Sequence, residues 1–141
     1  MNMSTVARHL VFHAAVVLLF GLLLGAPYAR AIKRGAAAQV VNSWRVAHLS
    51  LPIGATLMLA TAPLLAWLAV SDAVKWTIAG TLVVSAYGFC VATPLAAITG
   101  ERGLAPGGKG LGRLVYLGNW LGAVGSMVSA AVFLYAAFVS L

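Results

Sequence analysis

Four long apolar segments limit most strongly what this chain can fold into. A helix needs roughly 20 predominantly apolar residues to cross the hydrocarbon core of a bilayer, and each segment provides that length. A soluble domain of 141 residues, 62% hydrophobic and 8% charged, has too little interior to bury so much apolar surface. The sequence therefore predicts an all-α integral membrane protein, a single domain over residues 1–141 in which four transmembrane helices form a bundle. The expected helices are residues 9–29, 46–70, 74–98 and 113–141.

The connections between these segments indicate how the helices are joined. Residues 71–75 (SDAVK) predict a tight turn, which makes the second and third helices antiparallel neighbours. Residues 29–43 and 99–112 are the only sizeable polar connections and are expected to be loops. The first segment is expected to remain in the protein as a membrane helix, because its apolar stretch is long for a cleaved secretory signal.

Basic residues are distributed unevenly between the two sides of the expected membrane. Seven of them flank the first and third connections, and two lie on the other side. Because positive charge is retained in the cytoplasm, both termini are expected on the non-cytoplasmic side of a bacterial inner (cytoplasmic) membrane. The charges border apolar segments, so membrane lipid is the expected partner and nucleic acid is not. The seven are Arg30, Lys33, Arg34, Arg45, Arg102, Lys109 and Arg113; the two are Arg8 and Lys75.

Small residues recur at helical spacing in two segments. Gly21 and Gly25 are four residues apart in the first segment, and Gly118 and Gly122 in the fourth, with Ser126 and Ala130 continuing the second stripe. Small residues at this spacing let membrane helices approach closely. Because four short helices bury little surface alone, we expect a homo-oligomer.

The scarcity of acidic residues excludes several kinds of chemistry. Asp72 and Glu101 are the only acids, and they lie in connections on opposite sides of the expected membrane. Paired-carboxylate catalysis, a Ser-His-Asp relay and ion coupling through a membrane carboxylate are therefore not expected. Residues 103–110 (GLAPGGKG) match most of a phosphate-binding loop, but Gly110 stands where Ser or Thr is required and no strand precedes the segment. We interpret these glycines as a flexible connector.

The three histidines are the main candidates for a site. His9 and His13 are four residues apart and so share one helix face; they are either an interfacial pair or ligands of a metal or cofactor. His48 lies inside the second apolar segment, where an unpartnered imidazole is costly. It therefore needs a hydrogen bond, a metal or a haem iron as its partner. Zinc is disfavoured without further ligands nearby, whereas a haem needs one axial histidine and cations for its propionates, which Arg45 would supply.

Asn119, in the fourth apolar segment beside Trp120, is the polar residue there that is costliest to leave unpaired. It is expected either to hydrogen-bond between helices or to line a pocket.

These residues resemble a small family of four-helix membrane proteins that contains styrene oxide isomerase and hydroxylaminobenzene mutase. Arg8-His9 precedes LLFGLLLG (residues 18–25) at the family's distance, and Trp44 to His48 form the family's W-x-x-A-H. ERGL (residues 101–104) is similar to an Asn-Arg-Gly-Leu after the third helix. The four-helix layout completes a resemblance over nearly the whole chain.

The resemblance implies a homotrimer that holds haem b at its subunit interfaces, with His48 as the axial iron ligand. In styrene oxide isomerase the ferric iron acts as a Lewis acid on an epoxide oxygen. The candidate cofactor-binding residues are thus His48, Trp44, Arg45, His9, His13 and Asn119, with His48 as the metal ligand. If His9 or His13 supplied a sixth ligand, the iron would have no open position.

Departures from the family pattern leave the reaction unassigned. Gly54 stands where the family enzymes carry an asparagine, and an ungapped register puts Ser85 and Thr93 where the isomerase has a carboxylate and a tyrosine. The resemblance therefore carries over haem binding rather than epoxide isomerisation. The leading hypothesis is a membrane haem protein, either an isomerase or mutase of unassigned small-molecule substrate or a haem- or gas-binding protein. The alternative is a cofactor-free transporter subunit or assembly factor.

Overall fold

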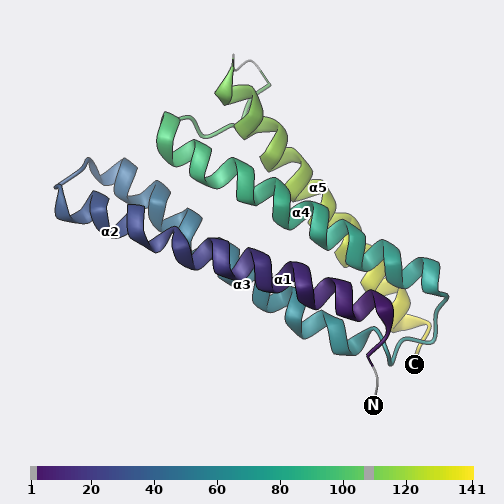
Figure 1. Ribbon diagram of the computed structural model, residues 1–141. Helices are drawn as coiled ribbons and strands as arrows, with labels where there is room; N and C mark the ends of the chain where they lie inside the picture. The colour runs from purple at the N-terminus through teal and green to yellow at the C-terminus, as the bar shows by residue number, and fades with distance from the viewer. Residues whose placement is uncertain (1–2, 107–109) are drawn as a thin grey trace.

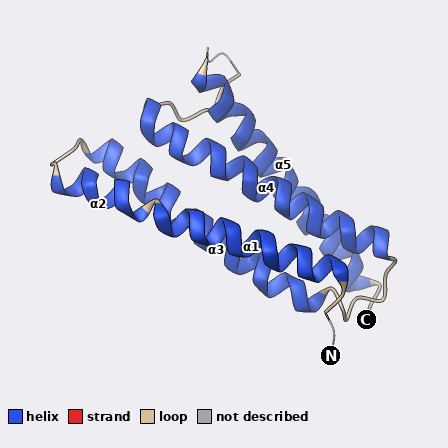
Figure 2. Ribbon diagram, in the orientation of Figure 1, coloured by secondary structure: helices blue, strands red, loops and turns tan. Residues whose placement is uncertain are grey.

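The structure is a bundle of long helices. The computed structural model describes residues 3–106 and 110–141, over which every regular element is an α-helix. The helices are α1 Thr5–Leu23, α2 Gly25–Lys33, α3 Ala38–Leu64, α4 Asp72–Thr99 and α5 Leu111–Phe138 (Figures 1 and 2). Four stretches are long and apolar enough to cross a membrane, with α1 and α2 together as one. The predicted all-α, multi-pass membrane fold is therefore confirmed.

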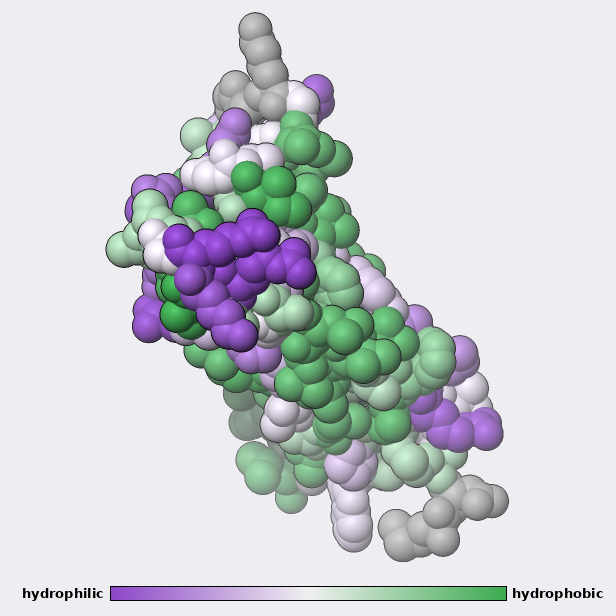
Figure 3. All heavy atoms as spheres, turned by 60° about the vertical axis from the view of Figure 1, so that its left-hand side comes forward, coloured by the Kyte–Doolittle hydropathy of each residue, from purple (hydrophilic) through white to green (hydrophobic). Residues whose placement is uncertain are grey.

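Both chain termini lie at one end of the molecule, which we call the terminal end (Figure 1). The connections after α2 and after α4 lie at the opposite end, the loop end. Apolar side chains cover the middle of the surface in Figure 3, and hydrophilic side chains gather away from it. This distribution is that of a protein whose middle lies in lipid. The phosphate-loop match at residues 103–110 lies partly outside the described residues.

The first connection is shorter than predicted. Of the loop expected at residues 29–43, only residues 34–37 lie outside helices, because α2 continues to Lys33 and α3 begins at Ala38. Alanine, arginine and lysine are strong helix formers, so polar composition alone does not end these helices. Gly35, with a φ of 61°, makes the turn in a conformation that glycine adopts without strain.

The connection after α3 comes earlier than predicted. Helix α3 ends at Leu64 and α4 begins at Asp72, so the turn predicted at residues 71–75 is mostly the first turn of α4. Ser71 is extended immediately before the helix, and Asp72 places a negative charge at the N-terminus, where the helix dipole favours it. The two helices are antiparallel neighbours, as predicted (Figure 1).

The first span is interrupted at Leu24, between α1 and α2. Pro27 accounts for this interruption, because it has no N–H to donate to the carbonyl of Leu23 and its ring disfavours a continuous helix. Carbonyl oxygens in the last turn of a helix have no intrahelical donor. The break therefore makes acceptors available in the middle of the first span.

Small residues bring the helices close together, as their spacing predicts. Gly21 of α1 is buried against α3, and a Cβ added to it would lie 2.5 Å from Cδ of Pro52. Gly88 of α4 faces Gly118 of α5, where an added Cβ on either would lie 2.7 Å from the other's carbonyl oxygen. Both contacts are within one chain, so these glycines stabilise the bundle itself.

The small-residue stripe on α5 follows a different path from the predicted one. After Gly122 the buried small residues are Gly125 and Ser129, whereas Ser126 is half-buried and Ala130 is exposed. A helix has 3.6 residues per turn, so positions four apart move steadily around it. Beyond Gly122, each buried small residue therefore lies one position earlier in the sequence than a strict spacing of four predicts.

Helices α3 and α5 lie on either side of α4 but, over the described residues, do not pack on each other. Helix α1 pairs with α3 and α4 with α5, and the two pairs diverge toward the loop end (Figure 1). At the terminal end the Ala69 N–H donates to the Ser140 hydroxyl over 2.9 Å. The bundle is therefore tied at one end and open along the space between α3 and α5.

Candidate functional site

His48 of α3 has a hydrogen-bonding partner, as the sequence requires. Its Nδ1 lies 2.9 Å from the carbonyl oxygen of Gly21, in the last turn of α1. A carbonyl only accepts hydrogen bonds, so Nδ1 carries the proton and donates it. Nε2 of the neutral ring is then unprotonated, which is the form that binds a metal. The half-buried imidazole is thus oriented by α1 with one nitrogen left for a ligand.

The start of α2 shapes the space around this ring. A Cβ added to Gly25 would lie 3.0 Å from Cε1 of His48, so a larger residue would crowd the imidazole. The ring centroid of Tyr28 lies 6.0 Å from that of His48, with the planes at 30°. The break at Leu24 therefore provides both the acceptor for Nδ1 and the room for the ring.

Trp44 and Arg45 lie about one turn nearer the loop end on α3. The exposed Arg45 guanidinium donates to Oδ1 of Asn42 over 2.6 Å. Arg45 also borders a surface cavity of about 360 Å³, with Tyr28, Ala38, Val41 and Asn42. Trp44 is half-buried and packs against the hydrophobic core. The structure thus brings a cation close to His48, while Trp44 fixes the position of α3.

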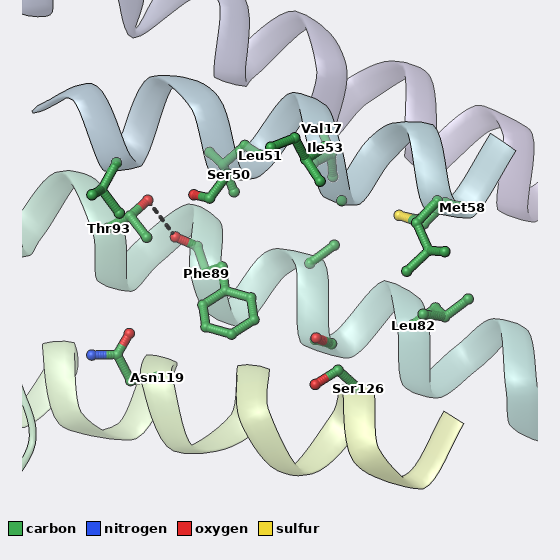
Figure 4. Close-up of a pocket in the computed structure, with 15 residues that line it drawn as sticks. Val17, Ser50, Leu51, Ile53, Met58, Leu82, Phe89, Thr93, Asn119 and Ser126 are labelled. Carbon is green, nitrogen blue, oxygen red and sulfur yellow. Dashed lines mark hydrogen bonds between the residues drawn. The ribbon is translucent and has the colours of Figure 1, made fainter. Parts of the chain in front are cut away.

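A second cavity lies on the opposite side of α3. It has a volume of about 400 Å³ and is bordered mainly by α3, α4 and α5. In Figure 4, Ser50 of α3, Phe89 and Thr93 of α4 and Asn119 of α5 lie around it. Gly54 and Ser85 also line it, whereas His48, on the α1 side of α3, does not.

Two hydroxyl groups at this cavity, those of Ser85 and Thr93, bond to the protein's own backbone. The Ser85 hydroxyl donates to the Gly122 carbonyl over 2.6 Å, and the Thr93 hydroxyl donates to the Phe89 carbonyl over 2.8 Å (Figure 4). None of the described residues that line the cavity is charged. Because a charged ligand would be left unpaired there, the cavity suits a neutral, largely apolar molecule.

Asn119 lines a pocket, one of the two roles that the sequence left open, and its hydrogen bond goes to a loop rather than to another helix. Its Nδ2 donates to the carbonyl of Arg102 over 3.1 Å, which ties α5 to the segment after α4. It also lines the apolar cavity and a third, more polar cavity. The third cavity has a volume of about 420 Å³, lies nearer the loop end and is bordered by Gln39 and Arg102. Asn119 thus marks the polar end of the space between α3 and α5, on the far side of α3 from His48.

His9 and His13 lie toward the terminal end of α1, away from His48. At 1.5 Å of rise per residue, they are about 18 Å and about 12 Å along α1 from the level of Gly21. His13 instead contacts α4, with its Nδ1 3.0 Å from the hydroxyl oxygen of Tyr87. The structure therefore does not bring either histidine to the site of His48 within one chain.

Over the described residues, no three His, Cys, Asp or Glu side chains gather into a group that could hold a metal ion.

The styrene oxide isomerase family matches residues 6–138, nearly the whole chain. The chain belongs to that family. This match confirms the resemblance found in the short motifs of the sequence. No curated protein matches the chain.

Three residues that line the cavity between α3 and α5 have counterparts in the family pattern described above. Gly54, Ser85 and Thr93 stand at the positions where the resemblance implies an asparagine, a carboxylate and a tyrosine, and all three line this one cavity. They come from two helices and from distant parts of the sequence, and the structure brings them to one cavity. In this chain the side chains at all three positions are small and uncharged.

Sequence reasoning missed the role of the first span in holding His48. The spacing of Gly21 and Gly25 indicates helix packing, and Gly21 does pack against α3. The Gly21 carbonyl also accepts the hydrogen bond of His48, and Gly25 leaves space for the imidazole. The available signal was Pro27, two residues after Gly25, because a proline inside a helix frees carbonyls in the preceding turn.

Proposed function

We propose that this chain is a haem b-binding membrane protein in which His48 is the axial iron ligand. The observation that carries the proposal is the 2.9 Å hydrogen bond from Nδ1 of His48 to the Gly21 carbonyl. An iron-ligating histidine commonly donates its other ring N–H to a carbonyl, which fixes the tautomer and orients the ring. A single histidine with Nε2 available is sufficient for a haem. When bound, the haem supplies an iron centre able to act as a Lewis acid or to bind a gas.

The residues around His48 suit such a group. Gly25 leaves room beside the imidazole, and the Tyr28 ring provides a flat surface next to it. Arg45, one turn toward the loop end, places positive charge where propionates would lie near the membrane surface. These groups bind and orient the cofactor; none of them is placed to transfer a proton to a substrate.

The positions of His48 and Gly54 on α3 support haem binding between subunits of a homo-oligomer, for which the resemblance implies a trimer. The two residues are six positions apart, which is roughly 240° around a helix. His48 therefore faces α1, while Gly54 borders the cavity on the α4 and α5 side. An iron held by His48 would be on the α1 side of α3, away from the cavity of its own chain, so a second copy of the chain would supply that cavity.

The apolar cavity favours isomerisation or rearrangement of a neutral, lipophilic small molecule at the iron. Its uncharged walls exclude water and orient a substrate by shape, with the Asn119 amide at the polar end. The second candidate is a non-catalytic haem- or gas-binding protein. It is favoured by the Ser85 and Thr93 hydroxyls, which are already bonded to backbone carbonyls.

An absorption spectrum of tag-free, detergent-purified protein tests haem binding. We expect a Soret band corresponding to one haem per chain, which His48→Ala abolishes and His13→Ala leaves unchanged. Absence of the band from wild-type protein, even after reconstitution with haem, would support the cofactor-free alternative of a transporter subunit or assembly factor. In that case His48→Ala lowers stability only.

Substrate assays separate the enzyme from the binder. Turnover of an aryl epoxide or an arylhydroxylamine by the haem-loaded protein, lost in His48→Ala, identifies an isomerase or mutase. Carbon monoxide binding to the reduced protein without turnover of either class identifies a gas-binding protein.

The basic residues at the loop end support an orientation with that end in the cytoplasm of a bacterium. A Lys33→Cys variant in intact cells tests it. We expect a membrane-impermeant thiol reagent to label this residue only after the inner membrane is broken. Labelling from the periplasm would reverse the topology.

A further inference from the structure

A cluster of nitrogen and aromatic side chains lies at the terminal end of α1, where the proposed haem site has no use for it. His9 and His13 lie one turn apart with their ring centroids 6.5 Å apart and their planes 22° from parallel. They line a shallow surface cavity together with Thr5, Arg8 and Phe12. The spacing of four residues places both imidazoles on one helix face.

Helix α4 orients His13. Tyr87, which is 38% exposed, has its hydroxyl oxygen 3.0 Å from Nδ1 of His13, and the two rings meet edge to face at 84°. When Nδ1 carries the proton, it donates to the Tyr87 oxygen, and the Tyr87 hydroxyl donates its own proton to water or a lipid headgroup. Nε2 of His13 then has a free lone pair directed away from α4. The tyrosine thus orients His13, with a hydroxyl that can donate as well as accept, in contrast to the Gly21 carbonyl beside His48.

His9 is held on its other side by Trp76 of α4, with the ring centroids 5.5 Å apart. His9 is exposed, so its imidazole has room to turn toward His13. Nitrogen–metal bonds of about 2 Å require the two Nε2 atoms to be about 3 Å apart, which a modest rotation of the exposed ring allows. Two imidazoles at this spacing suit a borderline divalent ion, and Cu²⁺ binds most tightly in the Irving–Williams order.

We propose that His9 and His13 form a two-nitrogen site for a divalent transition-metal ion of the Cu²⁺ or Zn²⁺ class at the terminal end of the membrane domain. Water completes the coordination, because the described residues offer no third side-chain ligand. Tyr87 is a positioning residue that orients the imidazole of His13. Arg8 borders the same cavity, and its charge opposes a bound cation. This site is independent of the haem site at His48.

Titration of Cu²⁺ into tag-free, detergent-solubilised protein, followed by calorimetry and electron paramagnetic resonance, tests the proposal. We expect one Cu²⁺ per chain with two nitrogen ligands. His9→Gln and His13→Gln should each weaken binding by at least an order of magnitude. Tyr87→Phe should weaken it about tenfold, the effect typical of losing a residue that orients a ligand. Arg8→Gln should strengthen it roughly fivefold at low ionic strength, with less effect in high salt.

His48→Ala is the matched control, because it removes a histidine of α3 that lies away from His9 and His13 and should leave the Cu²⁺ affinity unchanged. Wild-type affinity in both His9→Gln and His13→Gln would overturn the proposal, as would loss of Cu²⁺ binding in His48→Ala. Far-ultraviolet circular dichroism of each variant shows whether the helices are intact. His9 is exposed, so His9→Gln is expected to fold normally and keeps the test decisive if another variant does not.

Discussion

His48 of α3, beside the middle of the first span, and His13, toward the terminal end of that span, each have an oxygen atom at Nδ1 but have different surroundings. His48 donates from Nδ1 to a backbone carbonyl, and His13 has a tyrosine oxygen at its Nδ1. In both cases Nε2 is unprotonated when Nδ1 carries the proton of a neutral ring. The neighbours differ: His48 has Gly25 and a tyrosine ring beside it, whereas His13 has a second imidazole. A single oriented histidine with a flat space suits a large cofactor, and a pair suits a bare ion.

Filling the space beside His48 should have the largest effect. Gly25→Val places side-chain atoms where even a Cβ would be 3.0 Å from His48 Cε1. Crowding of a packed site costs about 1–3 kcal/mol, so the haem affinity should fall by about tenfold to a hundredfold. Spectroscopic haem titration measures this. Cu²⁺ binding at His9 and His13 should be unchanged. A loss of both haem and Cu²⁺ binding would mean that the two sites are not independent.

Removing the cation near His48 should have a smaller effect. Arg45 is exposed, and exposed ion pairs contribute little in water. Arg45→Gln should weaken haem binding by about twofold to fivefold, more at low salt than at high salt, because ions screen the interaction. Titrations at two ionic strengths measure the difference. An effect independent of salt would assign Arg45 a packing role instead.

Removing a hydroxyl from the cavity between α3 and α5 should change stability and leave haem binding intact. Ser85 is buried and donates to the Gly122 carbonyl over 2.6 Å. Hydrogen bonds between membrane helices contribute about 0.6 kcal/mol on average, so Ser85→Ala should lower the unfolding free energy by about that amount. Unfolding in mixed micelles, with the Soret band as a second signal, checks both parts. A lost Soret band would place Ser85 in the cofactor site.

Adding a methyl group on the cavity side of α3 should have the smallest effect. A Cβ added to Gly54 meets nothing within 4 Å, in contrast to one on Gly25. Gly54→Ala should therefore retain both stability and haem affinity and only reduce the space for a ligand in the cavity. Gly25→Ala, measured beside it, should weaken haem binding. Equal haem affinities for the two variants would remove the distinction between the two sides of α3.

The features that could be predicted from the sequence are those that depend on composition and on short spacing between residues. The four spans follow from apolar length, because no soluble fold can bury those segments. The need of His48 for a partner follows from the cost of burying an imidazole. Gly54, Ser85 and Thr93 could be connected only through the resemblance to a family, and the structure brings them to one cavity.

The remaining features depend on helix rotation and helix ends, which apolar composition does not encode. Because α5 has 3.6 residues per turn, its buried stripe passes to Gly125 and Ser129 rather than Ser126 and Ala130. Residues 29–43 are polar but rich in helix-forming residues, so most of the expected loop is helical. The separation of His13 from His48 required the axial register of α1 against α3, which no motif in the sequence fixes.

Chemical rescue of a His48→Gly variant during haem titration tests most directly whether His48 is the iron ligand. The account predicts that wild-type protein takes up one haem per chain, that His48→Gly takes up none, and that added imidazole restores the Soret band of the variant by occupying the vacated position. Restoration by imidazole would show that the variant is folded and lacks only the iron ligand. A His48→Gly variant that binds haem as tightly as wild-type protein without imidazole would contradict the account.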